Sequence, residues 1–401
     1  MPRRRDYRLF LISQTISNVG SSFTAFGLPL LVFRLTSSAV NLALTTVAGF
    51  LPYILFGLVI GAWVDRVDRR RALVGAVVAR GLTIAVLPVL GGLDVLTVWA
   101  VYAVAFVNTS LGIVSSAVES TAIPSLVSRD ELADANGKLR AGYAAAQVTG
   151  PLLAGALIGG GLPVTGVFAI DAVSFWLAAA LLLAIRTRFS GDPPRKERRS
   201  VASDIGTGLR YVLADPVLRG IALHAALYNL IGSTVTSQLV LFAHQRLGAD
   251  DAQVGLLFAC GALGTAVALF TFSRLARHVS FTTATLGVMM CWSVLVLGLS
   301  ASTDIRLGAV FWACAAGLPS VYAVRTLTLR QTVVPDHLLG RVQTTGQVLA
   351  WSAQPIGAFI GAWLISATGR IAVVYAGTAV LMAAITGCFW LGPLGKADMR
   401  E

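Results

Sequence analysis

The chain alternates between long apolar runs and short charged breaks, and this alternation restricts the possible folds more than any other feature of the sequence. A helix needs about 20 apolar residues to cross the hydrocarbon core of a bilayer. Hydrophobic residues make up 56% of the chain and charged residues only 12%. A soluble domain carries about 25% charged residues, because its surface faces water. The pattern therefore predicts an all-α integral membrane protein whose helices face lipid.

Twelve runs of the sequence are long enough to cross a bilayer. The first of them is too long for the apolar region of a signal peptide, so we expect it to remain as the first span. The expected transmembrane helices cover residues 9–33, 40–63, 72–92, 95–118, 138–161, 164–185, 218–243, 253–273, 280–300, 305–327, 343–367 and 370–392.

The basic residues lie mainly on one side of these spans. If the N-terminus is cytoplasmic, all but five of the 31 lysines and arginines fall in or next to cytoplasmic segments. The exceptions are Arg34, Arg246, Arg306 and Arg370 on the outer side and Arg80 inside a span. Because lysine and arginine favour the cytoplasmic side, the pattern predicts a multi-pass protein of the cell membrane with both termini in the cytoplasm. The net charge of +12 belongs to these loops, so no nucleic-acid partner is expected.

A polar stretch divides the chain into two halves with six expected spans each. We expect an N-terminal bundle of residues 1–185, a cytoplasmic linker of residues 186–217 and a C-terminal bundle of residues 218–401. The halves share short motifs at similar offsets, and Gly20-Ser21-Ser22 in the first corresponds to Gly232-Ser233-Thr234 in the second. Parallel six-helix repeats are typical of one large transporter fold. The sequence therefore predicts two pseudo-symmetric six-helix bundles.

A basic loop follows the second expected span. It contains Gly61, Asp65, Arg66, Arg69 and Arg70. A cluster of this kind can simply hold a loop on the cytoplasmic side. It also resembles the Gly-x-Leu-x-Asp-Arg-x-Gly-Arg-Arg loop of the major facilitator superfamily, which implies a gating role on the cytoplasmic side. The sequence departs from that motif in two places, where Trp63 replaces leucine and Asp68 replaces the second glycine.

Further motifs resemble one branch of this superfamily, the macrolide-efflux and enterobactin-exporter proteins. The resemblance implies export, commonly driven by the proton gradient. It is carried by Thr121-Ala122-Ile123-Pro124-Ser125-Leu126-Val127, by Ala169-Ile170-Asp171-Ala172-Val173-Ser174-Phe175 and by Pro335-Asp336-His337-Leu338-Leu339-Gly340-Arg341-Val342.

The fifth expected span contains Gly150, Pro151 and Gly155. Proline bends a helix, and small residues let two helices approach closely, so ordinary helix packing would explain the segment. The segment also resembles the Gly-x-x-x-Gly-Pro-x-x-Gly-Gly motif of antiporters in the superfamily, which implies export. Ala146 and Ala154 replace two glycines of that motif.

Three ionisable residues lie inside or near the ends of expected spans, where charge is costly and suggests a function. They are Arg80, Glu119 and Asp171. Arg80 either extends its side chain to the cytoplasmic face or pairs with an acid, and Glu119 is the expected partner by depth. Either acid is a candidate for the coupling proton. The fourth span lacks the arginine that many superfamily members have there.

The resemblance assigns spans 1, 4, 7 and 10 to a substrate cavity. Polar residues in these spans would provide hydrogen bonds without a strong fixed charge, which suits amphipathic and lipophilic substrates. Helix-to-helix hydrogen bonding is the alternative role for each of them. The candidates are Gln14, Asn18, Asn108, Asn229, Gln238 and Tyr322.

The sequence contains no phosphate-binding glycine loop, zinc-protease motif or catalytic cluster. We therefore expect a transporter rather than an enzyme, with no cofactor and no metal. The main hypothesis is a monomeric secondary active transporter that exports small amphipathic molecules in exchange for protons. An importer or facilitator on the same fold is one alternative. A membrane enzyme or lipid scramblase is the other.

Overall fold

The structure is a computed structural model that describes residues 2–64, 67–187, 189, 201–275 and 281–392. In these ranges the chain folds into α-helices and one short 3₁₀ helix, with no strand. The first part holds α1 (Pro2–Thr36), α2 (Ala39–Val64), α3 (Arg69–Gly92), α4 (Val98–Leu126), η1 (Arg129–Glu131), α5 (Leu132–Gly159), α6 (Val164–Ala184) and α7 (Val201–Ala214). The second part holds α8 (Pro216–Ser237), α9 (Leu239–Leu247), α10 (Asp251–Leu275), α11 (Phe281–Ala301), α12 (Ile305–Ala316), α13 (Leu318–Val333), α14 (Asp336–Thr368) and α15 (Ile371–Leu391).

The apolar runs fold as the membrane helices that the sequence predicts. Among the described residues, 10 helical segments are long and apolar enough to cross a membrane, and the bent pair α8 and α9 makes an eleventh. The α14 helix occupies the eleventh predicted span but is not among them. Its sequence includes polar residues such as Gln343 and Gln354. The all-α membrane fold is thus confirmed, whereas the number of twelve spans is not established.

Two of the predicted spans are broken helices. The span predicted at 218–243 bends by 50° between α8 and α9. The span predicted at 305–327 is interrupted at Gly317, between α12 and α13. A Cβ atom at Gly317 would lie 2.8 Å from the Cα of Thr265, so the absence of a side chain permits close contact with α10. Pro319 in the first turn of α13 has no backbone N–H to continue the helix, which accounts for the interruption, although residues 305–333 still form one span by length and hydropathy.

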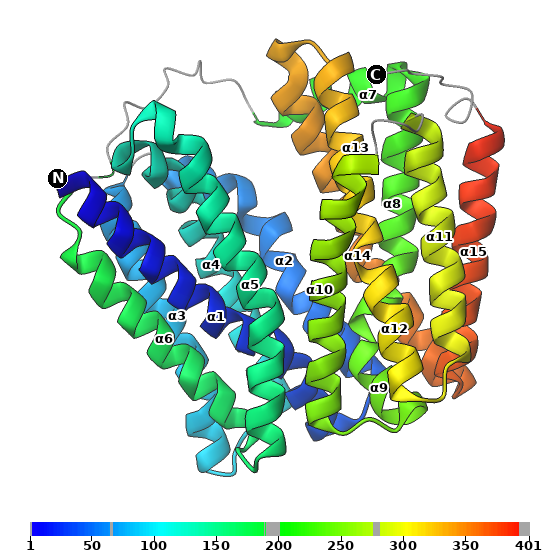
Figure 1. The fold of residues 1–401 in the computed structure, drawn as a ribbon, viewed down its shortest axis with the longest axis horizontal. Helices are drawn as coiled ribbons and strands as arrows, with labels where there is room; N and C mark the ends of the chain where they lie inside the picture. The colour runs from blue at the N-terminus through cyan, green and yellow to red at the C-terminus, as the bar shows by residue number, and fades with distance from the viewer. Residues whose placement is uncertain (1, 65–66, 188, 190–200, 276–280, 393–401) are drawn as a thin grey trace. The chain divides into compact units, whose positions relative to one another are not determined.

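The chain divides into two compact units (Figure 1). Unit 1 comprises residues 1–37 and 48–196, and unit 2 comprises residues 38–47 and 197–401. The beginning of α2 therefore groups with unit 2. The predicted division into the first six and the last six spans would assign all of α2 to the N-terminal bundle. The Gln238 side chain, which is fully buried, donates a hydrogen bond of 2.9 Å to the Ala39 carbonyl within unit 2.

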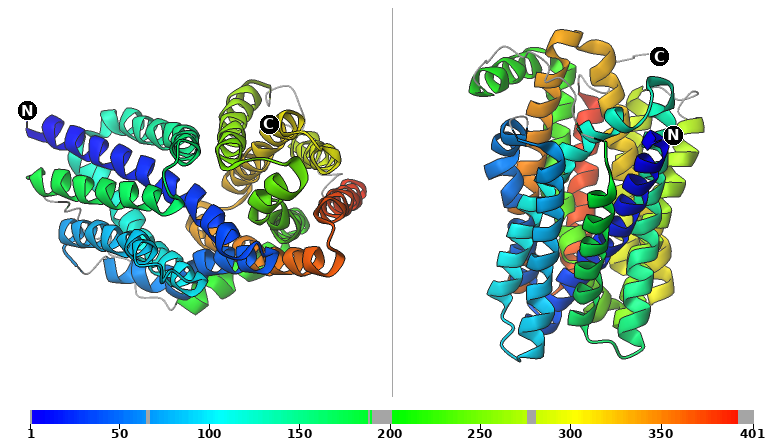
Figure 2. Two further views of the ribbon diagram at one scale, coloured as in Figure 1. Left: turned by 90° about the horizontal axis from the view of Figure 1, so that it is seen from below. Right: turned by 90° about the vertical axis from the view of Figure 1, so that its left-hand side faces the viewer.

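The two units repeat the same helix neighbours (Figures 1 and 2). In unit 1, α1 packs against α5 and α6, and α3 packs against α4 and α6. In unit 2, α8 packs against α14 and α15, and α11 packs against α12, α13 and α15. These are the corresponding spans in the order of the sequence, so the internal duplication inferred from short motifs is also visible in the packing of each unit.

A helix lies inside the segment that the sequence analysis treats as a linker. The α7 helix packs against α14 and α8. Its Val212 is buried in an apolar cluster with Leu218, Val334 and Val342. The linker of residues 186–217 is therefore not only an irregular loop, because its second half carries the docked amphipathic helix α7.

Candidate functional site

A buried polar centre lies inside unit 1 and is built around Arg80 of α3. The Arg80 Nε donates to Asn108 Oδ1 on α4 at 3.0 Å, and its Nη2 donates to Ser21 Oγ on α1 at 3.4 Å. The guanidinium carbon lies 4.3 Å from the centre of the Phe175 ring on α6. Helices α1, α3, α4 and α6 thus all contribute to holding one cation, through two neutral acceptors and an aromatic face.

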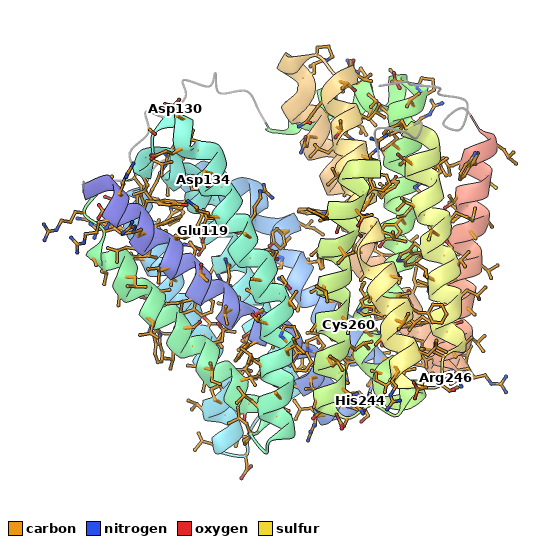
Figure 3. All side chains as sticks on the ribbon, in the orientation of Figure 1. Glu119, Asp130, Asp134, His244, Arg246 and Cys260 are labelled. Carbon is orange, nitrogen blue, oxygen red and sulfur yellow. The ribbon has the colours of Figure 1, made fainter. Side chains whose placement is uncertain are left out.

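The two candidate acids both interact electrostatically with this cation. Asp171 on α6 is fully buried and accepts hydrogen bonds from the hydroxyls of Thr24 and Ser174, the latter at 3.2 Å. Glu119 on α4 is half-buried and accepts a hydrogen bond from Gln14 on α1. Figure 3 shows Glu119 deeper in the bundle than Asp130 and Asp134, which lie at the end of unit 1 near η1. Each carboxylate therefore accepts at least one hydrogen bond from an uncharged side chain of α1.

Arg80 interacts electrostatically with both acids. No ion pair within 4.0 Å joins it to Asp171 or Glu119 among the residues that the structure describes. Of the two alternatives for Arg80, pairing with Glu119 takes the form of an electrostatic interaction without direct contact, and Asn108 and Ser21 accept the hydrogen bonds of the guanidinium. Sequence reasoning found all three charged residues, but it named Phe175 only as part of a family motif and did not predict its contact with Arg80.

The basic loop after α2 is only partly described. Gly61 lies in the last turn of α2, whereas Asp65 and Arg66 lie outside the described residues. Arg69 is the first residue of α3, and the Arg70 Nη2 donates to the Leu183 carbonyl at the end of α6 at 2.7 Å. This bond ties the start of α3 to the end of α6 inside unit 1.

Asp68, which departs from the family motif, caps α3. Its carboxylate accepts a hydrogen bond of 2.9 Å from the Arg71 amide. Aspartate is a favoured residue at this position, since it satisfies an amide that the helix leaves without a partner. The departure from glycine thus has a structural explanation that the sequence analysis missed.

The antiporter-like segment of α5 packs tightly against α1. Gly150, Pro151 and Gly155 are all buried, and α5 continues through the proline. A Cβ atom at Gly150 would overlap the Ser22 side chain. The structure therefore provides a reason for glycine at 150, namely close helix contact.

A pocket of about 430 Å³ lies within unit 2. Three helices form it, and two of the residues predicted to line a cavity, Asn229 and Tyr322, are on its wall. Asn229 also shares a hydrogen bond with Gln354 of α14. Its lining residues are Ala225, Tyr228 and Asn229 of α8, Pro319, Ser320, Tyr322, Ala323, Val324, Thr326, Leu327 and Arg330 of α13, and Gln343, Gly346, Ala350, Trp351 and Gln354 of α14.

The remaining predicted cavity residues have other positions. Gln14 and Asn108 belong to the polar centre of unit 1, Gln238 holds the start of α2, and Asn18 is half-buried on α1. Hydrogen bonding between helices, the alternative weighed for each of them, describes Gln14, Asn108 and Gln238.

Two residues next to the unit 2 pocket were missed by sequence reasoning. His224 is fully buried, and its Nδ1 lies 3.0 Å from the Tyr322 hydroxyl while its Nε2 lies 3.3 Å from Thr386 Oγ1. Arg330 was counted among the basic residues of a cytoplasmic loop, but α13 extends to Val333 and places Arg330 on the pocket wall. The charge pattern of the sequence cannot distinguish a loop from a helix wall at Arg330, whereas His224 lies inside a predicted span and only its hydrogen bonds reveal its place beside the pocket.

Comparison with known proteins relates the whole chain to membrane transporters. The family model described as transmembrane secretion effector matches residues 2–400. Macrolide efflux protein A of Streptococcus pyogenes is 24% identical over 96% of this chain and 96% of its own length. The multidrug efflux pump Tap of Mycolicibacterium fortuitum is 24% identical over 92% and 91%, respectively. The enterobactin exporter EntS of Salmonella typhi is 26% identical over 93% and 88%.

Solved structures show the same fold. A bacterial homologue of the iron transporter ferroportin aligns with a TM-score of 0.74 at 18% identity, over 96% of this chain and 98% of its own. A bacterial homologue of the human lysosomal transporter Spinster aligns with a TM-score of 0.73 at 15% identity, over 99% and 97%. The match of the family model over nearly every residue establishes that this chain belongs to the transmembrane secretion effector family of the major facilitator superfamily of membrane transporters.

Proposed function

We propose that the chain exports small amphipathic molecules from the cell and that proton entry drives the export. The observation that carries the proposal is the polar centre of unit 1, where Arg80 interacts electrostatically with Asp171 and Glu119. Ionisable groups inside a membrane bundle are costly, and proton relays are a main reason for their presence. The names of the macrolide, multidrug and enterobactin exporters support the direction of transport.

The charge asymmetry of the sequence supports a cell-membrane protein with both termini in the cytoplasm. We further propose that it works as a monomer by alternating access, and that the segment of residues 186–217 connects the two bundles that move. In this scheme the loop around Asp65 gates the cytoplasmic side, and the Gly150-Pro151 segment favours exchange over uptake. Both roles rest on resemblance to superfamily motifs.

The test measures accumulation of erythromycin, ethidium and the aromatic carboxylate 2-naphthoate in cells with and without the protein, and repeats it with a protonophore. We expect lower accumulation of at least one compound, and loss of this difference when the protonophore is present. Export that persists without a proton gradient would contradict the coupling. Higher accumulation in expressing cells would favour an importer instead.

Two amide variants then identify the coupling acid. If Asp171 or Glu119 carries the proton, its amide variant, Asp171→Asn or Glu119→Gln, should stop uphill export while still permitting downhill exchange. Wild-type uphill export in both variants would exclude the two acids as proton carriers. Glu131→Gln is the matched control, because this exposed carboxylate lies outside the polar centre. Hydrogen bonds from the Ser128 hydroxyl and amide lower the pKa of Glu131, so the control also removes a negative charge at neutral pH.

A further inference from the structure

The charge balance of the unit 2 pocket differs from that of the polar centre in unit 1. No acidic residue is among the residues that line the pocket, whereas Arg330 is on its wall. Helices α8 and α13 contain no aspartate or glutamate, and α14 contains only Asp336, its first residue. Arg80, by contrast, has two acids within electrostatic reach. The pocket in unit 2 therefore carries a cation that its own helices do not neutralise.

The Arg330 guanidinium has no hydrogen bond or ion pair in the part of the chain that the structure describes, and the side chain is half-buried. A buried or partly buried charge is costly unless an opposite charge accompanies it. Arg325, the other arginine of α13, is directed elsewhere: its guanidinium carbon lies 5.5 Å from the Phe281 ring centre. Arg330 is thus the basic group of α13 that is available to a molecule in the pocket.

The backbone of α14 makes room for this guanidinium. A Cβ atom at Gly346 would lie 2.9 Å from Nη1 and 3.2 Å from Nη2 of Arg330. The missing side chain therefore allows the planar group to lie against the helix. A planar guanidinium presents paired N–H donors that match the two oxygens of a carboxylate.

The rest of the pocket offers contacts for a ring, and none of the described residues on its wall has an acidic, histidine or cysteine side chain that would bind a metal ion. Tyr228, Tyr322 and Trp351 line it with aromatic surface, and Asn229, Gln343 and Gln354 add amide groups. The Tyr228 ring is held in edge-to-face contact with Trp292, with 5.3 Å between ring centres. The volume of about 430 Å³ falls in the range of small-molecule sites, which is about 300–1,000 Å³.

We propose that this pocket binds aromatic carboxylates, with Arg330 pairing with the carboxylate and the aromatic side chains contacting the ring. The inference rests on the proposed export function, since it names a substrate class for a transporter of small molecules. It also changes the expectation from the sequence, which predicted a cavity without a strong fixed charge.

The test compares 2-naphthoate with 2-naphthalenemethanol, which share a ring system and differ in the carboxylate. Binding is measured by titration calorimetry on the full chain in phosphatidylcholine nanodiscs, with empty nanodiscs subtracted. We expect the wild-type protein to bind naphthoate at least about tenfold more tightly, as a charge-assisted paired contact implies. Arg330→Gln should abolish the preference, and Arg330→Lys should keep part of it, because lysine retains the charge without the paired donors.

Two further variants make the result specific. Gly346→Ala should weaken naphthoate binding and leave binding of the alcohol unchanged, since the added methyl would displace the guanidinium. Arg219→Gln is the matched control, because this exposed arginine of α8 is not on the pocket wall and should retain the full preference. Should Arg330→Gln not yield a monodisperse protein, Arg330→Lys and Gly346→Ala decide the question.

Equal affinity of the wild type for the two compounds, no binding of naphthoate, or an unchanged preference in Arg330→Gln would each overturn the inference. The assay measures binding without transport, so its outcome is separate from that of the export test. A naphthoate preference without proton-driven export would support the pocket and refute the proposed function. Proton-driven export without that preference would do the reverse.

Discussion

Arg80 on α3 and Asn108 on α4 are joined by a hydrogen bond of 3.0 Å from the arginine Nε to the asparagine Oδ1. The bond fixes the cation of unit 1 through a neutral side chain. An arginine held this way keeps its charge available to Asp171 and Glu119, whereas a tight ion pair would be committed to one of them. The position of the guanidinium thus depends on an uncharged residue.

Asn108→Ala should therefore lower the initial rate of transport while leaving the amount of folded protein in the membrane close to that of the wild type. Loss of a hydrogen bond to a charged group costs about 1.5–3 kcal/mol, which corresponds to a rate effect of about tenfold or more. The measurement is the initial rate of proton-driven efflux in inverted membrane vesicles, with protein amount determined by immunoblot. Asn136→Ala is the control, because Asn136 is exposed and its side chain donates a hydrogen bond to the Leu132 carbonyl of its own helix. A wild-type rate for Asn108→Ala would show that Arg80 needs no support from α4.

Gly150→Ala should destabilise unit 1 through contact with Ser22. The new methyl would overlap the serine side chain, and overfilling a packed contact costs about 1–3 kcal/mol. Thermal unfolding of the detergent-solubilised protein measures the effect. The double variant Gly150→Ala, Ser22→Gly should recover most of the loss. Gly57→Ala is the matched control, since a Cβ at that helical glycine meets nothing within 4 Å.

Asp68→Ala should lower stability by about 1 kcal/mol, because the Arg71 amide loses its acceptor at the start of α3. Asp68→Asn should be close to wild type, as asparagine caps a helix equally well. Both variants are compared by the midpoint of thermal unfolding. If alanine and asparagine have the same effect, the carboxylate acts through its charge and the capping explanation is wrong.

The helical membrane fold follows from the sequence because hydropathy acts locally: each apolar run carries its own signal. The bend at Gln238 does not follow from hydropathy, and the interruption at Gly317 follows from the nearby Pro319 rather than from any change in hydropathy. The α7 helix was missed for a related reason. Its apolar face is short and lies within a polar stretch. The packing of Val212 against Val334 and Val342 can be recognised only in the folded structure, because those residues are far away in the sequence.

The candidate site divides in the same way. Arg80, Glu119 and Asp171 were identifiable because charge in an apolar run is conspicuous. Their arrangement was not, because the neutral residues that hold Arg80 look like any other polar residue in a helix. Arg330 illustrates the opposite error: its charge suggested a loop, and only the extension of α13 to Val333 places it on a pocket wall.

The docking of α7 determines where the polypeptide tolerates a cut. A break placed before Val201 would leave Val212 on the same fragment as Leu218, Val334 and Val342, so the second fragment would keep its apolar cover. A break after Ala214 would place α7 on the first fragment and separate it from α8 and α14, against which it packs. Two coexpressed fragments should therefore reassemble far better from the first design than from the second, although the two sites are less than twenty residues apart.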